Sequence, residues 1–182
     1  LGLGGPELRG RMGVPDDSLL FYPQLLAPRQ RTVWSLAELI RDYLEVPVEV
    51  QQFVGGWYPL AREARCELDD DPGSEAPRLG METIVGDEIW DPQAKVRIRL
   101  GPLSREEYED FLPRGKGFRA LKALTAFFGD GNYDFEVQLV LDREEAPLLE
   151  LGREEEGTPL GWLTWIQTRP LTRDPDETTL TL

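Results

Sequence analysis

The stretch 95–113, KVRIRLGPLSREEYEDFLP, constrains the fold more than any other, because a strand signal and a helix start signal follow one another directly. In KVRIRL, apolar and basic residues alternate strictly, which predicts a half-buried strand. Its apolar face carries Val96, Ile98 and Leu100, and its basic face carries Lys95, Arg97 and Arg99. We expect Gly101 and Pro102 to end this strand.

A helix should begin at Arg105, because the four residues around it have the pattern of a capping box. Ser104 and Glu107 have the spacing in which each side chain accepts a bond from the other residue's backbone amide. Leu103 and Tyr108 occupy the two positions of a hydrophobic staple. The sequence therefore predicts a well-defined turn from strand into helix.

A second helix and a second strand follow. FRALKALTAFFG has helical spacing and should end at Gly129, with Phe118, Leu121, Leu124 or Thr125, and Phe128 buried. YDFEVQLVLD alternates and predicts a strand. We expect one face of that strand to carry Tyr133, Phe135, Val137, Leu139 and Leu141.

The first part of the chain shows the same order of elements. DDSLLFYPQLL predicts a short helix broken near Pro23, and WSLAELIRDYL a helix with a capping box of Ser35 and Glu38 and a staple of Trp34 and Leu39. VPVEVQQFVGG predicts a strand. The C-terminal tail from Thr168, TRPLTRDPDETTLTL, looks weakly structured.

These two series of elements suggest a degenerate internal duplication. Three short matches occur in one order: Glu49-Val50-Gln51 with Glu136-Val137-Gln138, Pro59-Leu60 with Pro147-Leu148, and Leu79-Gly80 with Leu160-Gly161. We therefore predict an α+β fold of two pseudo-duplicated helix–helix–strand units, 1–101 and 102–182, with a mixed or antiparallel sheet. A long excursion should follow the first repeated strand and a shorter one the second.

Both excursions begin with apolar residues and end with acidic ones. The apolar residues are Trp57 and Tyr58 in GGWYPL, and Leu148, Leu149 and Leu151 in APLLELG. Such residues either pin the excursion to its own core or are presented to a partner protein. The sequence leaves both explanations open.

Composition excludes several classes of function. The 182 residues carry a net charge of -14, the wrong sign for binding nucleic acid or an anionic membrane. No apolar run approaches the roughly twenty residues of a spanning helix, so we expect a soluble, cytoplasmic chain without membrane insertion. Histidine is absent, which removes the most common general base and metal ligand. The single cysteine, Cys66, cannot form an intrachain disulfide, and we interpret it as incidental.

Two acidic clusters support only a weaker hypothesis. Asp69, Asp70, Asp71, Ser74 and Glu75 could ligate calcium, but they lack the spacing and glycine of an EF-hand. We favour a solvated loop there, as for REEEG at 153–157. A calcium-binding module or a carboxylate-dependent hydrolase is the alternative function, although no spacing places two acids across a cleft. For the basic row Lys95, Arg97 and Arg99 we favour pairing with Asp134 and Glu136 over an acidic partner.

Several segments resemble the C-terminal half of the TssG family, also called ImpH or VasB. They are DYLEVPVEVQQFVGGWYPL, LGMETIVGDEIWDPQAKVRIRLGPLS, DFLPRGKGFRALKALTAFFG, FEVQLVL and LGWLTWI. The resemblance covers about residues 1–168. Its most specific parts are IWDPQ at 89–93, the RLGPL that follows, and the late LGW.

The resemblance implies a non-enzymatic structural role in the type VI secretion baseplate, with no cofactor and no metal. Family members join two copies of TssF in a wedge and bind TssK trimers through two protruding loops. They work in the cytoplasm of Gram-negative bacteria, on the inner-membrane complex. Carried to this sequence, the resemblance and the repeat predict TssK-binding residues. They are Trp57, Tyr58, Pro59 and Leu60 in the first loop, and Pro147, Leu148, Leu149 and Leu151 in the second.

Overall fold

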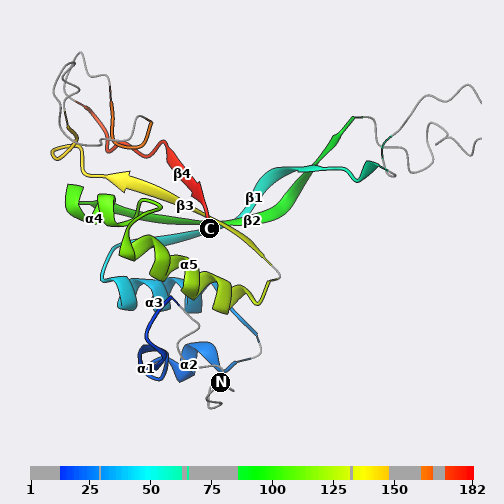
Figure 1. Cartoon of the computed structure of the whole chain (residues 1–182), viewed down its shortest axis with the longest axis horizontal. Helices are drawn as coiled ribbons and strands as arrows, with labels where there is room; N and C mark the ends of the chain where they lie inside the picture. The colour runs from blue at the N-terminus through cyan, green and yellow to red at the C-terminus, as the bar shows by residue number, and fades with distance from the viewer. Residues whose placement is uncertain are drawn as a thin grey trace, which may run out of the picture. The chain divides into compact units, whose positions relative to one another are not determined.

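The computed structural model contains helices and one sheet, as predicted for an α+β chain (Figure 1). It describes residues 13–28, 30–62, 65, 86–131, 133–147, 161–165 and 171–182. The elements in chain order are α1 Asp16–Leu19, α2 Pro23–Leu26, α3 Val33–Leu44, β1 Val48–Pro59, β2 Glu88–Leu103, α4 Arg105–Asp110, α5 Lys116–Gly129, β3 Asp134–Leu141 and β4 Thr178–Thr181.

The four strands form a sheet in the order β1-β2-β3-β4. β1 and β2 are antiparallel, because bonds join the end of each strand to the start of the other. The Leu60 amide donates to the Asp87 carbonyl at 2.7 Å, and the Gly101 amide donates to the Pro47 carbonyl at 3.0 Å. β1 and β2 therefore form one long hairpin.

β3 is parallel to β2 and antiparallel to β4. The Asp142 amide donates to the Leu103 carbonyl at 2.8 Å, and Arg97 pairs with Glu136, so the same offset of 39 residues recurs along both strands. Between β3 and β4 the register runs from Glu136 opposite Thr181 to Leu139 opposite Thr178. The sheet is thus mixed, within the range that the sequence predicted.

The core lies between one face of this sheet and the helices. α3 and α5 contact each other, and α4 contacts both α5 and β3 (Figure 1). The buried apolar side chains of helices and strands form one cluster, which includes Leu36, Leu39, Ile40, Ile98, Leu100, Tyr108, Leu121, Leu124, Val137, Leu139 and Leu141. Full burial of each of the aliphatic side chains contributes roughly 1.5–3 kcal/mol. The predicted inward faces of the strand at 95–100 and of α5 are therefore confirmed.

The transition from β2 into α4 is the one that the sequence predicted. The Ser104 hydroxyl accepts from the Glu107 amide, and the Glu107 carboxylate accepts from the Ser104 amide at 2.8 Å. Leu103 and Tyr108 are both fully buried. Capping box and staple are both in place.

The start of α3 differs from the prediction. Its N-cap is Thr32, whose hydroxyl accepts from the Ser35 amide at 3.1 Å, so the helix begins at Val33 and Ser35 lies inside it. Trp34 is 67% exposed and forms no staple. The predicted capping box of Ser35 and Glu38 is therefore wrong, because Thr32 caps the helix three residues before Ser35. The left-handed residue that ends α5 is likewise Asp130, and Gly129 is the last helical residue.

Both strands of the long hairpin extend beyond their predicted ends. β1 continues beyond Gly56 to Pro59. β2 continues through Gly101 and Pro102 to Leu103. At Gly101, φ is +126° and an added Cβ would lie 2.4 Å from the Val140 carbonyl oxygen. Gly101 permits close approach of β3 instead of ending the strand.

The C-terminal tail and Tyr133 also differ from expectation. Thr178–Thr181 forms β4 along β3, so this part of the tail is ordered by strand pairing. Tyr133 precedes β3 and is 58% exposed, whereas Phe135, the next residue of the predicted face, is buried.

Contacts divide the chain into two compact units, 1–52 with 96–182, and 53–95. The boundary that the sequence predicted after residue 101 separates the two proposed repeat units, and not the two units that the contacts define. In the structure, β1 and β3 each follow a helix, and each pairs antiparallel with the next strand along the chain. That order agrees with a duplication, whose test by superposition of Val50 on Val137 stays a prediction.

Candidate interaction surfaces

The unit 53–95 contains a two-stranded ribbon made from the end of β1 and the start of β2 (Figure 1). The bond between Leu60 and Asp87 sets the register, which places Trp57 directly opposite Trp90. Their ring centroids are 5.4 Å apart at an interplanar angle of 62°, an edge-to-face contact. Such pairs contribute about 0.5–1.5 kcal/mol beyond the area they bury.

Gly55 provides the space for this tryptophan pair. A Cβ built on Gly55 would lie 1.9 Å from the Trp90 ring, so any larger residue would displace the indole. Gly55 lies two residues before Trp57 and shares its face of the strand. On one face of the ribbon, therefore, the Trp90 ring lies against Gly55 and contacts the Trp57 ring.

Large apolar side chains remain exposed on the ribbon. The exposed fractions are 70% for Phe53, 62% for Trp57, 49% for Trp90 and 39% for Ile89. In the described part of the unit 53–95 these two strands have no second layer over them, and clustered exposed aromatics are typical of partner-binding surfaces. This is the strongest candidate interaction surface among the described residues.

The first predicted loop residues lie on this ribbon or at its end. Trp57 and Pro59 are exposed, whereas Tyr58 and Leu60 are half-buried. Trp57, Tyr58 and Pro59 belong to strand β1 and not to an irregular loop. Phe53, Ile89 and Trp90 were not predicted from the sequence to lie on this surface. Alternation in the hairpin could have indicated Trp90, the tryptophan across from Trp57.

Most of the second predicted loop lies outside the described residues. Pro147 is half-buried, and Leu148, Leu149 and Leu151 are not among the residues that the structure describes. The described residues also do not include Cys66, the acidic residues at 69–75 or those at 153–157. Within the described ranges, no group of three or more metal-ligating side chains comes together.

The basic row of β2 has a structural use. The Arg97 guanidinium pairs with the Glu136 carboxylate at 2.5 Å, as predicted. Arg99 lies 3.2 Å from Asp176 and 3.9 Å from Glu49. These contacts link β2 to β1, to β3 and to the segment before β4. Neutralisation within the sheet explains Arg97 and Arg99 without an acidic partner.

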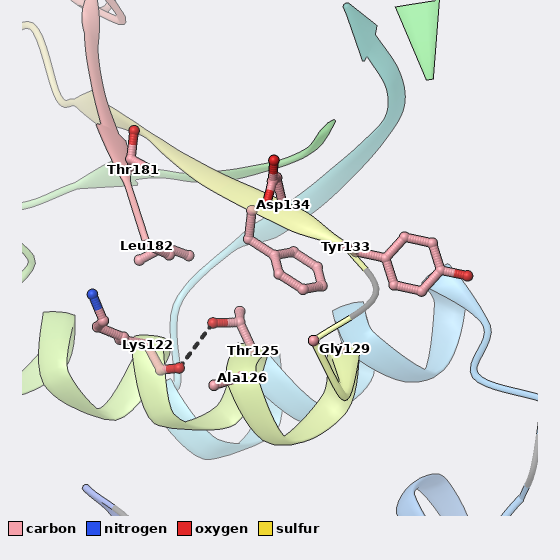
Figure 2. A pocket seen from close by; sticks show the side chains of 10 residues that line it. Lys122, Thr125, Ala126, Gly129, Tyr133, Asp134, Thr181 and Leu182 are labelled. Carbon is pink, nitrogen blue, oxygen red and sulfur yellow. Dashed lines mark hydrogen bonds between the residues drawn. The ribbon is translucent and has the colours of Figure 1, made fainter. Parts of the chain in front are cut away.

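A small pocket lies between the second half of α5 and the adjoining ends of β3 and β4 (Figure 2). The Thr125 hydroxyl donates within its own helix, to the carbonyls of Leu121 and Lys122, as the dashed line in Figure 2 shows for Lys122. Phe135 and Ala126 line the pocket as apolar residues. Lys122, Tyr133 and Asp134 also line the pocket.

Two tyrosines have a raised pKa, and both are structural. Burial, and after it the 2.7 Å hydrogen bond to the Asp42 carboxylate, raise the pKa of Tyr22 to about 12. Burial also raises the pKa of Tyr108, whose hydroxyl donates to the Trp162 carbonyl at 2.9 Å. Both phenols thus serve as hydrogen-bond donors at neutral pH.

Comparison with known families gives a clear result. The family model described as type VI secretion, TssG, matches residues 1–167. The chain belongs to the TssG family. The predicted family resemblance is thereby confirmed over nearly the same range. A comparison with curated proteins gave no match.

Two solved structures share the fold of this TssG-family chain. One is the cryo-electron microscopy structure of a type VI secretion TssK-TssF-TssG baseplate subcomplex. It contains a chain with 22% identity and a TM-score of 0.72, over 99% of this chain and 73% of that one. The other is a type VI secretion baseplate complex, with 22% identity and a TM-score of 0.65, over 98% of this chain and 50% of that one.

This TssG-family chain therefore spans about three quarters of one matched chain and half of the other. Among the residues that the structure describes, no helix is both long enough and apolar enough to cross a bilayer.

Proposed function

We propose that this chain is part of a non-enzymatic adaptor in the type VI secretion baseplate. It joins two copies of TssF and binds TssK trimers, on the cytoplasmic side of the inner-membrane complex. Membership of the TssG family and a fold shared with chains of baseplate assemblies support this role. The observation that carries the proposal is the exposed tryptophan pair of the ribbon.

The ribbon has the features of a contact surface for TssK. Trp57 presents an indole that is 62% exposed, yet its contact with Trp90 holds it in one orientation. A fixed aromatic side chain loses little entropy on binding, and tryptophan is enriched among residues that dominate interfaces. Trp57 and Trp90 would act together, with Pro59 exposed beside them.

The second contact would come from the excursion that begins at Pro147, where Leu148, Leu149 and Leu151 are the proposed apolar anchors. Two weak contacts from one chain raise the overall affinity, because the second binding event is intramolecular. A TssG-family chain could thus hold two copies of one TssK assembly.

A pull-down of the full-length protein against TssK and TssF separately tests this role. We expect retention by each partner, and retention by TssK alone should fall when Trp57 and Trp90 are both changed to alanine. If the double variant loses TssF and keeps TssK, the ribbon serves the other partner. If neither partner is retained by the unaltered protein, the adaptor role is wrong.

A further inference from the structure

We infer that Phe53 is a positioning residue, whose left-handed backbone inverts the side-chain alternation of β1 and so places Trp57 opposite Trp90. Phe53 lies in the middle of β1 and has a φ of +60°. An L-residue other than glycine seldom adopts a positive φ, and strand residues have φ of about -120 to -140°. The inference rests on the proposed function for its consequence, the binding of TssK, and not for the pairing of the strands.

The first half of β1 turns its even-numbered residues towards the core. The bond from the Gly101 amide to the Pro47 carbonyl pairs these two residues. Counting along both strands from this pair places Val50 opposite Ile98. Ile98 and Val48 belong to the apolar core, and Val50 packs against it.

The second half of β1 turns an odd-numbered residue towards Trp90. The bond from the Leu60 amide to the Asp87 carbonyl places Trp57 opposite Trp90, and their rings are in contact. On β2, Trp90 and Ile98 are both even-numbered, and no residue between them has a positive φ. Alternation is therefore unbroken in β2, and it changes sense in β1 before Trp57.

Phe53 is the residue of β1 at which this change occurs. The structure describes β1 throughout, and Phe53 alone in it has a positive φ. From residue 47 to 60 the first strand advances 13 residues, while the second advances 14 from 87 to 101, a mismatch of one residue as in a β-bulge. Without this break, Tyr58 would lie opposite Trp90, and the Trp57 indole would lie on the other face.

The conformation of Phe53 is strained, because a left-handed L-residue brings its Cβ close to a carbonyl oxygen. Burial of its own ring compensates little, since the side chain is 70% exposed. Strained backbone persists where neighbouring contacts or function maintain it. The contact that Phe53 permits is that of Trp57 with Trp90, the two indoles that we propose to bind TssK.

Disulfide cross-linking distinguishes the two registers in the full-length protein. In the register of the structure Pro59 lies opposite Glu88, whereas an unbroken β1 would place Leu60 there. Glu88→Cys is therefore combined with Pro59→Cys or with Leu60→Cys, and Cys66 and any other cysteine are changed to serine. Opposed residues are close enough for a disulfide, so the ratio of the two yields after oxidation reports the register.

Two variants change the backbone preference in opposite directions. Valine is β-branched and resists a positive φ, whereas glycine adopts it freely. We expect the ratio of Pro59 to Leu60 cross-links to fall about tenfold in Phe53→Val and to stay high in Phe53→Gly. Gln52→Val, at the neighbouring exposed residue without a positive φ, is the matched control and should leave the ratio unchanged.

A second measurement does not depend on the valine variant. In an ordinary strand position, alanine is more stabilising than glycine. At a positive φ the order reverses, so amide exchange in the ribbon should be slower in Phe53→Gly than in Phe53→Ala. The ordinary order would overturn the inference.

Affinity for TssK is measured in parallel and should fall about tenfold in Phe53→Val. An unchanged cross-link ratio in Phe53→Val would overturn the inference, as would equal falls in Phe53→Val and Phe53→Gly. A fall of the ratio confined to Phe53→Val, with unchanged TssK affinity, would support the inference and contradict the proposed role of the tryptophan pair in binding TssK.

Discussion

At the scale of single residues, the contact between Arg97 and Glu136 joins strands β2 and β3 through a largely buried ion pair. The Glu136 side chain is 9% exposed and that of Arg97 30%, so the pair is largely removed from water. Removing one partner of a buried pair costs more than the pair contributes, because a charge stays behind in a poorly solvated place.

We therefore expect Arg97→Ala to lower the free energy of unfolding by about 2 kcal/mol, measured by urea denaturation. The matched control is Arg105→Ala, which breaks a pair with Glu109 whose two side chains are about half exposed. That change should cost less than about 0.5 kcal/mol. Equal losses in the two variants would contradict the assignment of Arg97 as a sheet-joining residue.

Tyr22 should make stability depend on alkaline pH. Its pKa is raised from 10.0 to about 12 in the folded chain, so the folded state keeps the phenol proton after the unfolded state has lost it. The contribution of the Tyr22 hydroxyl is complete below pH 10 and is lost as pH rises towards 12. The difference in unfolding free energy between the unaltered protein and Tyr22→Phe should therefore shrink over that range. A constant difference across it would count against the bond to Asp42.

At the scale of elements, local signals predicted the helices better than the strands. The capping box at Ser104 and the apolar face of α5 depend on residues within two turns of each other, and both are confirmed. Strand ends depend on partners far along the chain. Gly101 looks like a breaker in the sequence but lies against Val140, and Thr178–Thr181 in the tail forms a strand by pairing with β3.

The same reason explains the candidate surface. Trp57 was predicted because it stands at the start of an apolar run, whereas its contact with Trp90 becomes recognisable only when the register of the hairpin is known. Sequence patterns indicate which side chains are unusual. Pairing decides which of them meet.

The ribbon itself should depend on Gly55. In Gly55→Ala the new methyl group would overlap the Trp90 ring, so the edge-to-face contact with Trp57 should be lost. We expect the near-ultraviolet circular dichroism of the indoles to fall as far as it does in Trp90→Ala, with the melting temperature of the other compact unit unchanged. Val54→Ala, one residue away, should keep the signal. An unchanged near-ultraviolet circular dichroism signal in Gly55→Ala would show that the tryptophan pair does not need a glycine at position 55.

At the scale of the whole molecule, the chain combines a helix-covered sheet with a ribbon that carries exposed aromatics. The sheet and the helices share a single apolar core. This combination suits an assembly component that must hold two binding segments, as proposed for a TssG-family protein.

The most direct test is the affinity of the full-length protein for TssK when Trp57 is changed to alanine. Trp34→Ala is the matched control, because Trp34 is 67% exposed on α3 in the other compact unit. We predict that Trp57→Ala weakens TssK binding by roughly 30-fold, equivalent to about 2 kcal/mol, while Trp34→Ala leaves it unchanged and neither variant shifts the main melting temperature. Loss of thermal stability in Trp57→Ala with full TssK affinity would contradict the account, because the indole would then serve only the fold.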